Sequence, residues 1–411
     1  GGTCLPDPYY PGGYCTTLAC EDNLSCSRGP HDNLCVQFPT QSMCVRRCAV
    51  GSDCRTPGYA CTNVAGRLNI CSPDVTPPVR GGLDPSTYPI PIACGLSSET
   101  GEVRIDYDIA DTTVSYMVTP FTLDGASLRP QRVELPSGSV IDMRGDNEFQ
   151  TAPSLIFGFI NPIVVPGTPA FRSQLEAGRH TLVVSTRTDN LCWYLLERAS
   201  TGATLDLNLY FTGLDGLSAG TAPSDPTVAS LVELSSTILE GAGITLGTVR
   251  YFDGNEDYGF IRSDYDAQEL VESSAPPGED VDSLFSLNVF LTRGFDGSVL
   301  GLSLGLPGAA ALHGSRSSGV VVSAEYLNDR DGAAFTAQVL AHEVGHYLGL
   351  FHTTEQGARG FDPLTDTPQC QPWNVRSCPD RTNLMFPFAG ADQTVISEQQ
   401  AGQMRANPLV R

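Results

Sequence analysis

The distribution of cysteine constrains the fold of this chain more than any other feature. Of its 14 cysteines, ten lie within the first 71 residues, and the other four are Cys94, Cys192, Cys370 and Cys378. An even count, dense in a short Gly- and Pro-rich segment, is typical of a disulfide framework in an oxidising compartment. A zinc ribbon would need paired CxxC steps, and the sequence has none. We expect disulfides throughout, with Cys94 paired to Cys192 and Cys370 to Cys378, while the pairing of the first ten stays open.

Length and local composition indicate a multidomain chain, since 411 residues exceed a single ordinary core. Residues 1–74 have few large apolar side chains and are expected to form a small disulfide-rich module. Residues 75–93 are a Pro/Gly-rich linker. Residues 94–202 contain short Val-, Ile- and aromatic-rich runs between turn residues, which predicts an all-β sandwich that serves as a scaffold. Residues 203–411 mix strand and helix patterns and are expected to form an α/β (α+β) domain.

Within the last part, the patterns predict one strand, one helix and then further strands. Residues 204–211 alternate in polarity, which predicts a half-buried strand. A helix should follow, capped by Ser224 or Asp225, with Pro226 in its first turn and an end at Gly241 or Gly243. The later strands are expected at residues 244–252, 287–293 and 319–327.

The charge of the chain restricts its partners. The formal net charge is −22, from 24 Lys+Arg against 46 Asp+Glu, which argues against binding to nucleic acid or an anionic membrane. No run of 18 apolar residues occurs, so no membrane insertion is expected. The chain starts at Gly1 without a basic and apolar leader, and we expect a secreted, extracellular protein whose signal peptide has been removed.

The stretch AHEVGHYLGLFH, residues 341–352, holds three of the six histidines. Residues 331–350 have the apolar spacing of a buried helix, on which His342 and His346 lie one turn apart on the same face. Two such imidazoles reach one metal ion. Glu343 is rotated by about 100° from His342, which suits a general base acting on water beside that metal.

A zinc ion that keeps one position open needs a third protein ligand. Gly349 can adopt a positive φ and turn the chain, so that His352 returns to the metal. The alternatives are histidines with purely structural partners, or a structural zinc. A structural zinc prefers a closed fourth ligand, commonly Cys, and after the histidines no cysteine follows in the sequence until Cys370.

The segment HEVGHYLGLFH resembles the zinc signature of the metzincin metallopeptidases, and TNLMFPF resembles their Met-turn, with Met385 beneath the metal. Within the metzincins the likeness is to the pappalysin family, including its secreted bacterial members. It rests also on FDPLTDTPQC and on ISEQQAGQMR, where Ser397 and Gln400 form an expected capping box. The resemblance covers about residues 203–411.

This resemblance implies a secreted zinc endopeptidase that acts on protein or peptide substrates, with Glu343 as general base and then general acid. It also implies a peptide bound along an edge strand, for which the candidate is the segment Gly319, Val320, Val321 and Val322. Calcium is a second expected cofactor, because hard oxygen ligands lie close together in FDPLTDT: Asp362, Asp366 and Thr367, with Thr365 beside them.

One position departs from the family. Many metzincins carry a tyrosine two residues after the Met-turn methionine, and this chain has Pro387, so another group must help to stabilise the oxyanion. Tyr326 and Tyr347 are expected to be core or cleft-lining residues. Two other readings stay open. The chain could be a surface-binding or adhesion protein with a vestigial peptidase domain, or the first 200 residues could hold a pro-segment that keeps the peptidase latent.

Overall fold

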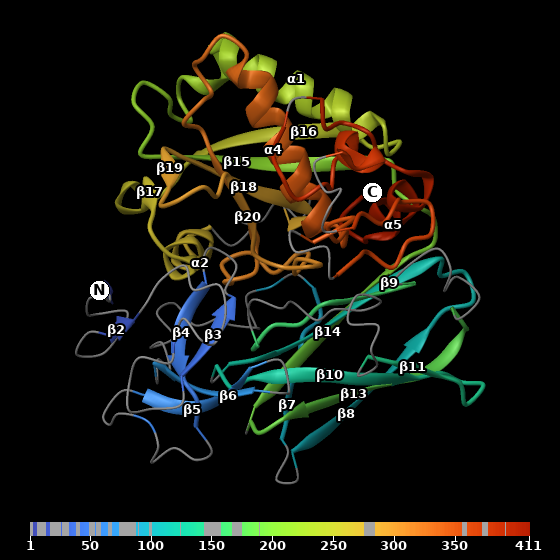
Figure 1. Cartoon of the computed structure of the whole chain (residues 1–411). Helices are drawn as coiled ribbons and strands as arrows, with labels where there is room; N and C mark the ends of the chain where they lie inside the picture. The colour runs from blue at the N-terminus through green and yellow to red at the C-terminus, as the bar shows by residue number, and fades with distance from the viewer. Residues whose placement is uncertain are drawn as a thin grey trace. The chain divides into compact units, whose positions relative to one another are not determined.

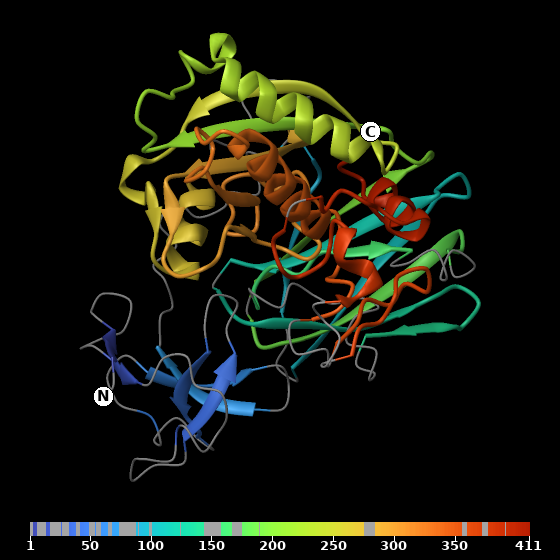
Figure 2. The same cartoon turned by 45° about the horizontal axis from the view of Figure 1, so that its top comes forward.

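The chain divides into two compact units in the computed structural model (Figures 1 and 2). One unit comprises residues 1–80 with 263–265, and the other comprises residues 81–262 with 266–411. Among the residues that the structure describes, no helix is long and apolar enough to cross a membrane. These residues are 3–5, 14–16, 26, 33–37, 42–48, 54, 59–64, 68–73, 88, 90–97, 101–123, 125–143, 158–166, 175–188, 190–274, 284–355, 360–371, 377–390 and 392–411.

The first unit is built from three antiparallel hairpins. These pair β1 (Thr3–Leu5) with β2 (Tyr14–Thr16), β3 (Asn33–Gln37) with β4 (Ser42–Arg46), and β5 (Tyr59–Val64) with β6 (Leu68–Pro73). Disulfides join Cys26 to Cys44 and Cys54 to Cys71. Val45 is the only buried apolar side chain, apart from cysteines, among the residues described in this unit. Among these described residues the buried apolar atoms are therefore mostly those of cysteines, as expected for a module that its bridges hold together.

Two four-stranded antiparallel sheets follow. The first has the order β11 (Val140–Asp142), β10 (Leu128–Glu134), β13 (Gly178–Thr186) and β8 (Glu102–Ile109). The second has the order β12 (Ile163–Val165), β9 (Ser115–Thr122), β14 (Leu191–Arg198) and β7 (Ala93–Leu96), and the Cys94–Cys192 disulfide joins β7 to β14. Side chains from both sheets share one hydrophobic cluster. The predicted antiparallel strands are thus present, while a separate sandwich domain stays a prediction.

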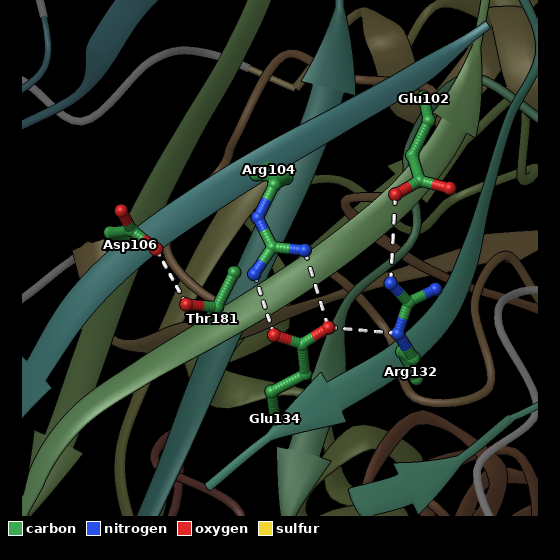
Figure 3. A network of polar contacts seen from close by, with 6 residues as sticks. All are labelled: Glu102, Arg104, Asp106, Arg132, Glu134 and Thr181. Carbon is green, nitrogen blue, oxygen red and sulfur yellow. Dashed lines mark hydrogen bonds and ion pairs between the residues drawn. The ribbon is translucent and has the colours of Figure 1, made fainter. Parts of the chain in front are cut away.

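The outer face of the first sheet carries a chain of polar contacts (Figure 3). The Arg104 guanidinium bonds the Glu134 carboxylate at 2.5 Å, and Arg132 Nε bonds the same carboxylate at 2.9 Å. Arg132 also lies 3.6 Å from Glu102. Because these side chains are partly or largely exposed, each pair contributes about 1 kcal/mol or less. The network keeps this face hydrophilic, and burial of the opposite face stabilises the sheet.

The remainder of the second unit is an α/β layer structure around a five-stranded sheet (Figures 1 and 2). Its order is β16 (Thr245–Asp253), β15 (Thr204–Thr212), β18 (Ser286–Thr292), β21 (Gly319–Ser323) and β20 (Gly301–Ser303). All pairs are parallel except β20 with β21. Helices α1 (Pro226–Glu240) and α4 (Gly332–Tyr347) pack against each other and on this sheet. Shorter elements are α2 (Asp264–Glu272), α5 (Glu398–Ala406), η5 (Ala222–Ser224), η6 (Glu256–Tyr258), η8 (Pro379–Thr382), β17 (Phe260–Ile261) and β19 (Gly294–Phe295).

The helix and cap predictions are confirmed. Asp225 caps α1 by accepting hydrogen bonds from the N–H groups of Thr227 and Val228, Pro226 is the first helical residue, and Gly241 follows the last. The capping box of Ser397 with Gln400 is present at the start of α5.

Two strand predictions are wrong. The segment Gly319–Val322 is not an edge strand, because β20 pairs with the side of β21 opposite to β18. The segment 204–211 is not half-buried, because its alternate residues Asp206, Asn208 and Tyr210 are buried as well. Tyr210 packs in a second cluster with residues of α2, so β15 is covered on both faces.

The antiparallel sheets and the α4 layer share a hydrophobic core. Met117, Phe121 and Tyr194 lie in one cluster with α4 residues and with Met385. The Tyr194 hydroxyl donates to the Ala310 carbonyl at 2.6 Å, and the Tyr347 hydroxyl of α4 donates to the adjacent Ala309 carbonyl at 3.1 Å. The β-rich segment is therefore built into the core of the second unit, which supports a scaffold role for it.

Candidate metal centre

Three histidine side chains converge on one point at the end of α4. His342 and His346 project from successive turns of the helix, and Gly349 has a φ of 109°, which turns the chain back toward the helix. The Nε2 atom of His352 then lies 3.2 Å from Nε2 of His342 and 3.1 Å from Nε2 of His346. The structure thus brings together the three residues that the spacing selected.

Main-chain carbonyls fix the tautomers of the two helical histidines. His342 Nδ1 lies 2.6 Å from the Leu384 carbonyl, and His346 Nδ1 lies 2.7 Å from the Leu350 carbonyl. A carbonyl only accepts, so each Nδ1 carries the proton and each Nε2 presents a lone pair. Burial lowers the pKa of His342 to about 3 and holds the pKa of His346 well below its usual value, in both cases with a contribution from His352. Both rings are neutral at pH 7.

This donor set fits zinc. Nitrogens that share one tetrahedral zinc at about 2.0–2.1 Å lie close to the separations seen between these Nε2 atoms, and three histidines leave one position open. Within the described part of the chain, the only other cluster of three potential metal ligands is Cys48, Cys54 and Cys71. Those cysteines are all in disulfides and cannot bind as thiolates.

Glu343 lies beside this centre and faces the edge strand. The residue is 6% exposed, and an added Cβ at Gly301 of β20 would lie 2.7 Å from its Oε1. Burial raises the pKa of Glu343 to about 8, although the nearby Ser303 backbone N–H acts to lower it. A cation held by the three histidines would favour the ionised form, so the two influences oppose each other.

The predicted Met-turn supports two of the three histidines. Met385 is fully buried, and a Cβ at Gly345 of α4 would meet its sulfur at 2.5 Å, so the methionine packs directly on the helix between the two ligands. The Leu384 carbonyl holds His342, and the Met385 carbonyl accepts from the Thr353 N–H, next to His352. One turn thereby orients the helix and the returning chain.

Tyr347 is a core residue, as expected, whereas Tyr326 is exposed. The buried Tyr347 hydroxyl contacts the Ala309 and Ser317 carbonyls, which makes it a core residue. Tyr326 is 39% exposed and packs edge to face on Phe335, near the start of α4. Pro387 follows the Met-turn and has no hydroxyl to offer.

The predicted calcium residues are only partly brought together. Thr367 Oγ1 donates to Asp362 Oδ1 at 2.6 Å, and Asp362 Oδ2 is buried without a partner among the described residues. Asp366 instead accepts from the Ser397 hydroxyl and the Gln399 N–H, both at 2.9 Å, at the start of α5. Sequence analysis missed Asp380, a buried residue whose charge contributes to the raised pKa of Asp362.

The position of Asp380 was not evident because it lies far from FDPLTDT in the sequence. It follows Cys378, and the predicted Cys370–Cys378 disulfide, which the structure contains, returns the chain to this region. The predicted Cys370–Cys378 disulfide could have been used to place Asp380 near Asp362.

His352 differs from the other two histidines because a side chain holds its second nitrogen. Its Nδ1 lies 3.2 Å from Glu355 Oε2. We expect Glu355→Ala to weaken zinc binding by about 10-fold, since partners of ligating histidines typically have that effect. Competition with a chromogenic zinc chelator would measure this affinity. Glu355→Gln keeps an acceptor and should lose less, and the exposed helical Glu240→Ala is the control. Equal affinity in Glu355→Ala and Glu240→Ala would contradict the role.

Comparison with known proteins locates the family likeness. Residues 288–400 match the M43 peptidase family, described as pregnancy-associated plasma protein-A. The resemblance to pappalysins is therefore confirmed over this segment, which includes every residue of the metal centre. No curated protein matches the chain.

Two solved structures show a more distant likeness. Archaemetzincin from Methanopyrus kandleri is 16% identical, over 51% of this chain and 90% of that chain, with a TM-score of 0.28. Metalloproteinase-II from Bacteroides fragilis is 15% identical, over 50% of this chain and 53% of that chain, with a TM-score of 0.29. The chain thus spans about half the length of the latter protein, and neither likeness carries an argument about activity.

Proposed function

We propose that this protein is a secreted zinc-dependent endopeptidase. The observation that carries the proposal is the convergence of three histidine Nε2 atoms beside the buried Glu343 carboxylate. The match of residues 288–400 to a peptidase family supports the same chemistry. Disulfides in both units support an extracellular location, because such bridges persist in oxidising compartments.

His342, His346 and His352 would hold the zinc ion, which when bound polarises the scissile carbonyl and lowers the pKa of water. Glu343 takes a proton from the attacking water onto its carboxylate and then gives it to the nitrogen of the leaving amine. Burial raises the pKa of this carboxyl in the metal-free protein, and a bound cation would shift it back toward the ionised form that accepts a proton.

The substrate strand is expected along β20 in place of β21. Leu304 N–H donates to the Gly319 carbonyl and Ser323 N–H to the Leu300 carbonyl, so residues 300 and 304 point their polar groups at β21. Polar groups alternate in direction along an antiparallel strand, and those of Gly301 and Ser303 therefore point away from β21. An extended peptide can pair with them, as in other β-augmentation complexes.

A digestion experiment tests the proposal. Zinc-free protein, zinc-restored protein and a chelator-treated sample would be incubated with an unstructured protein and with peptides blocked at both ends, and products identified by mass spectrometry. Internal cuts that appear only with zinc are expected. Removal of single terminal residues would indicate an exopeptidase instead.

Inactivity of the zinc-restored protein would raise the alternative of a latent or vestigial peptidase. Residues 1–80 are the segment to remove in that case, because the antiparallel sheets share the core of the second unit. If the shortened protein were inactive as well, the surface-binding reading would replace the peptidase.

The proposal also includes calcium bound at Asp362. The pH dependence of the stability of the protein tests this site. Burial raises the pKa of Asp362 to about 7 and that of Asp380 to about 6, from an ordinary value of 3.8. Both bind protons more tightly in the folded chain, so their contribution is fully present below about pH 4 and is lost as pH rises toward 7. Calcium favours the ionised carboxylates and should offset this loss.

We therefore expect the melting temperature of the zinc-free protein to fall between pH 5 and pH 8, with a smaller fall when calcium is present. Differential scanning fluorimetry with and without calcium measures this. Asp362→Asn removes one of the titrating groups and should reduce the fall in melting temperature. An identical profile in Asp362→Asn, with no response to calcium in either protein, would contradict both assignments.

A further inference from the structure

The edge strand β20 is only three residues long, yet it contacts the general base at two points. The Ser303 backbone N–H lies near enough to the Glu343 carboxyl to lower its pKa, against the larger effect of burial, which raises it. At Gly301, an added Cβ would lie 2.6 Å from Glu343 Cγ and 2.7 Å from its Oε1. The Glu343 side chain thus packs directly against the Cα of Gly301.

Little room exists to relieve such a contact. Three residue pairs bind β20 to β21, from Gly301 opposite Val322 to Ser303 opposite Val320. Helix α4, which carries Glu343, packs on both β20 and β21 and thereby restricts the position of the Glu343 Cα. The three atoms that a side chain at 301 would meet all belong to Glu343: Cγ at 2.6 Å, the carboxylate oxygen Oε1 at 2.7 Å and Cδ at 2.9 Å.

We infer that Gly301 is a positioning residue for Glu343, a role that rests on the proposed function of the site. The absence of a Cβ at 301 leaves the space that the Glu343 Cγ and carboxylate occupy against the edge strand.

The Ser303 N–H group faces the free edge, where a peptide substrate would pair. A substrate strand paired with this edge would run past the Glu343 side chain, which Gly301 contacts. The strand that binds substrate therefore also orients the base.

A double-mutant cycle tests the contact without any measurement of activity. Gly301→Ala should lower the melting temperature by about 3 °C or more when Glu343 is present, and by about 1 °C or less in the Glu343→Ala protein, where the space is open. Gly319→Ala is the matched control, because its Cβ would lie 2.6 Å from the Asn288 carbonyl, a group of β18. That variant should lose the same amount in both backgrounds.

Kinetics then test the positioning role. Gly301→Ala should lower kcat by at least about 10-fold at unchanged zinc content, with KM within about 3-fold, since small displacements of a catalytic group have large effects. Gly220→Ala, where only the Ser218 hydroxyl lies within 4 Å, at 3.8 Å, is expected to behave as wild type.

The outcomes separate the two proposals. Equal losses of stability by Gly301→Ala in both backgrounds would overturn the contact, and an unchanged kcat would overturn the positioning role. Coupling in the cycle, together with inactivity of both the full-length protein and the protein without residues 1–80, would uphold the contact and refute the peptidase.

Discussion

Glu343→Gln is expected to abolish turnover while zinc stays bound. Glutamine has the size of glutamate and can fill the same space beside Gly301, but it cannot take a proton from water at neutral pH. General base and acid catalysis contribute about 10²- to 10⁴-fold, so kcat should fall by at least about 1000-fold when both steps are lost. The measurement is kcat on a peptide identified in the digestion, with the zinc content of each sample determined by atomic emission.

The helical Glu240→Gln is the control for general effects of losing a carboxylate, since Glu240 lies exposed at the end of α1. It should keep both zinc and activity. Should Glu343→Gln retain more than about a tenth of the wild-type kcat at equal zinc content, another group would have to be the base.

His342→Ala is expected to lose zinc as well as activity. The substitution removes one of three ligands and also the bond to the Leu384 carbonyl, which links α4 to the Met-turn. Loss of a partner behind a ligand weakens binding by about 10- to 100-fold, so loss of the ligand itself should exceed about 100-fold. Zinc content after dialysis against a weak chelator and the residual kcat measure this effect.

A buried histidine elsewhere provides the matched control. His180 is fully buried in the antiparallel sheets, and its Nδ1 lies 3.1 Å from the Tyr116 hydroxyl. His180→Ala should lower the melting temperature but retain zinc. If His342→Ala kept a full equivalent of zinc under the same dialysis, the three-histidine centre would be refuted.

The metal centre was predictable because its information is local. Helix periodicity places His342 and His346 on one face, and a single glycine three residues later accounts for the return of His352. The caps of α1 and α5 are local as well, because each depends on side chains within three residues of the helix start.

The edge strand was not predictable for the opposite reason. Three residues, Gly301 to Ser303, carry no measurable alternation, whereas the apolar run 319–323 has the strongest strand signal in the region. Apolar content indicates burial, and a strand buried on both faces is typically central in its sheet. The prediction that β15 is half-buried was wrong for a related reason. The pattern of one strand cannot show whether a helix covers its second face.

Asp380 and the contact between Gly301 and Glu343 were missed because they depend on the tertiary structure. Asp380 reaches Asp362 through a disulfide-closed loop, and Gly301 reaches Glu343 through strand pairing. Contacts of this kind between separate segments of the chain produce no periodic pattern in a single sequence.

The supports behind the three histidines differ in how substitution can alter them. Two are carbonyls, of Leu384 and Leu350, which every amino acid at those positions would supply. The third is the Glu355 carboxylate, which a single codon change removes or replaces. Of these three supports, only the one at position 355 can be altered by substitution, so zinc affinity can change gradually there. Substitution of a ligating histidine, in contrast, removes a ligand altogether. Natural divergence and laboratory selection for tighter or weaker zinc binding should both concentrate there.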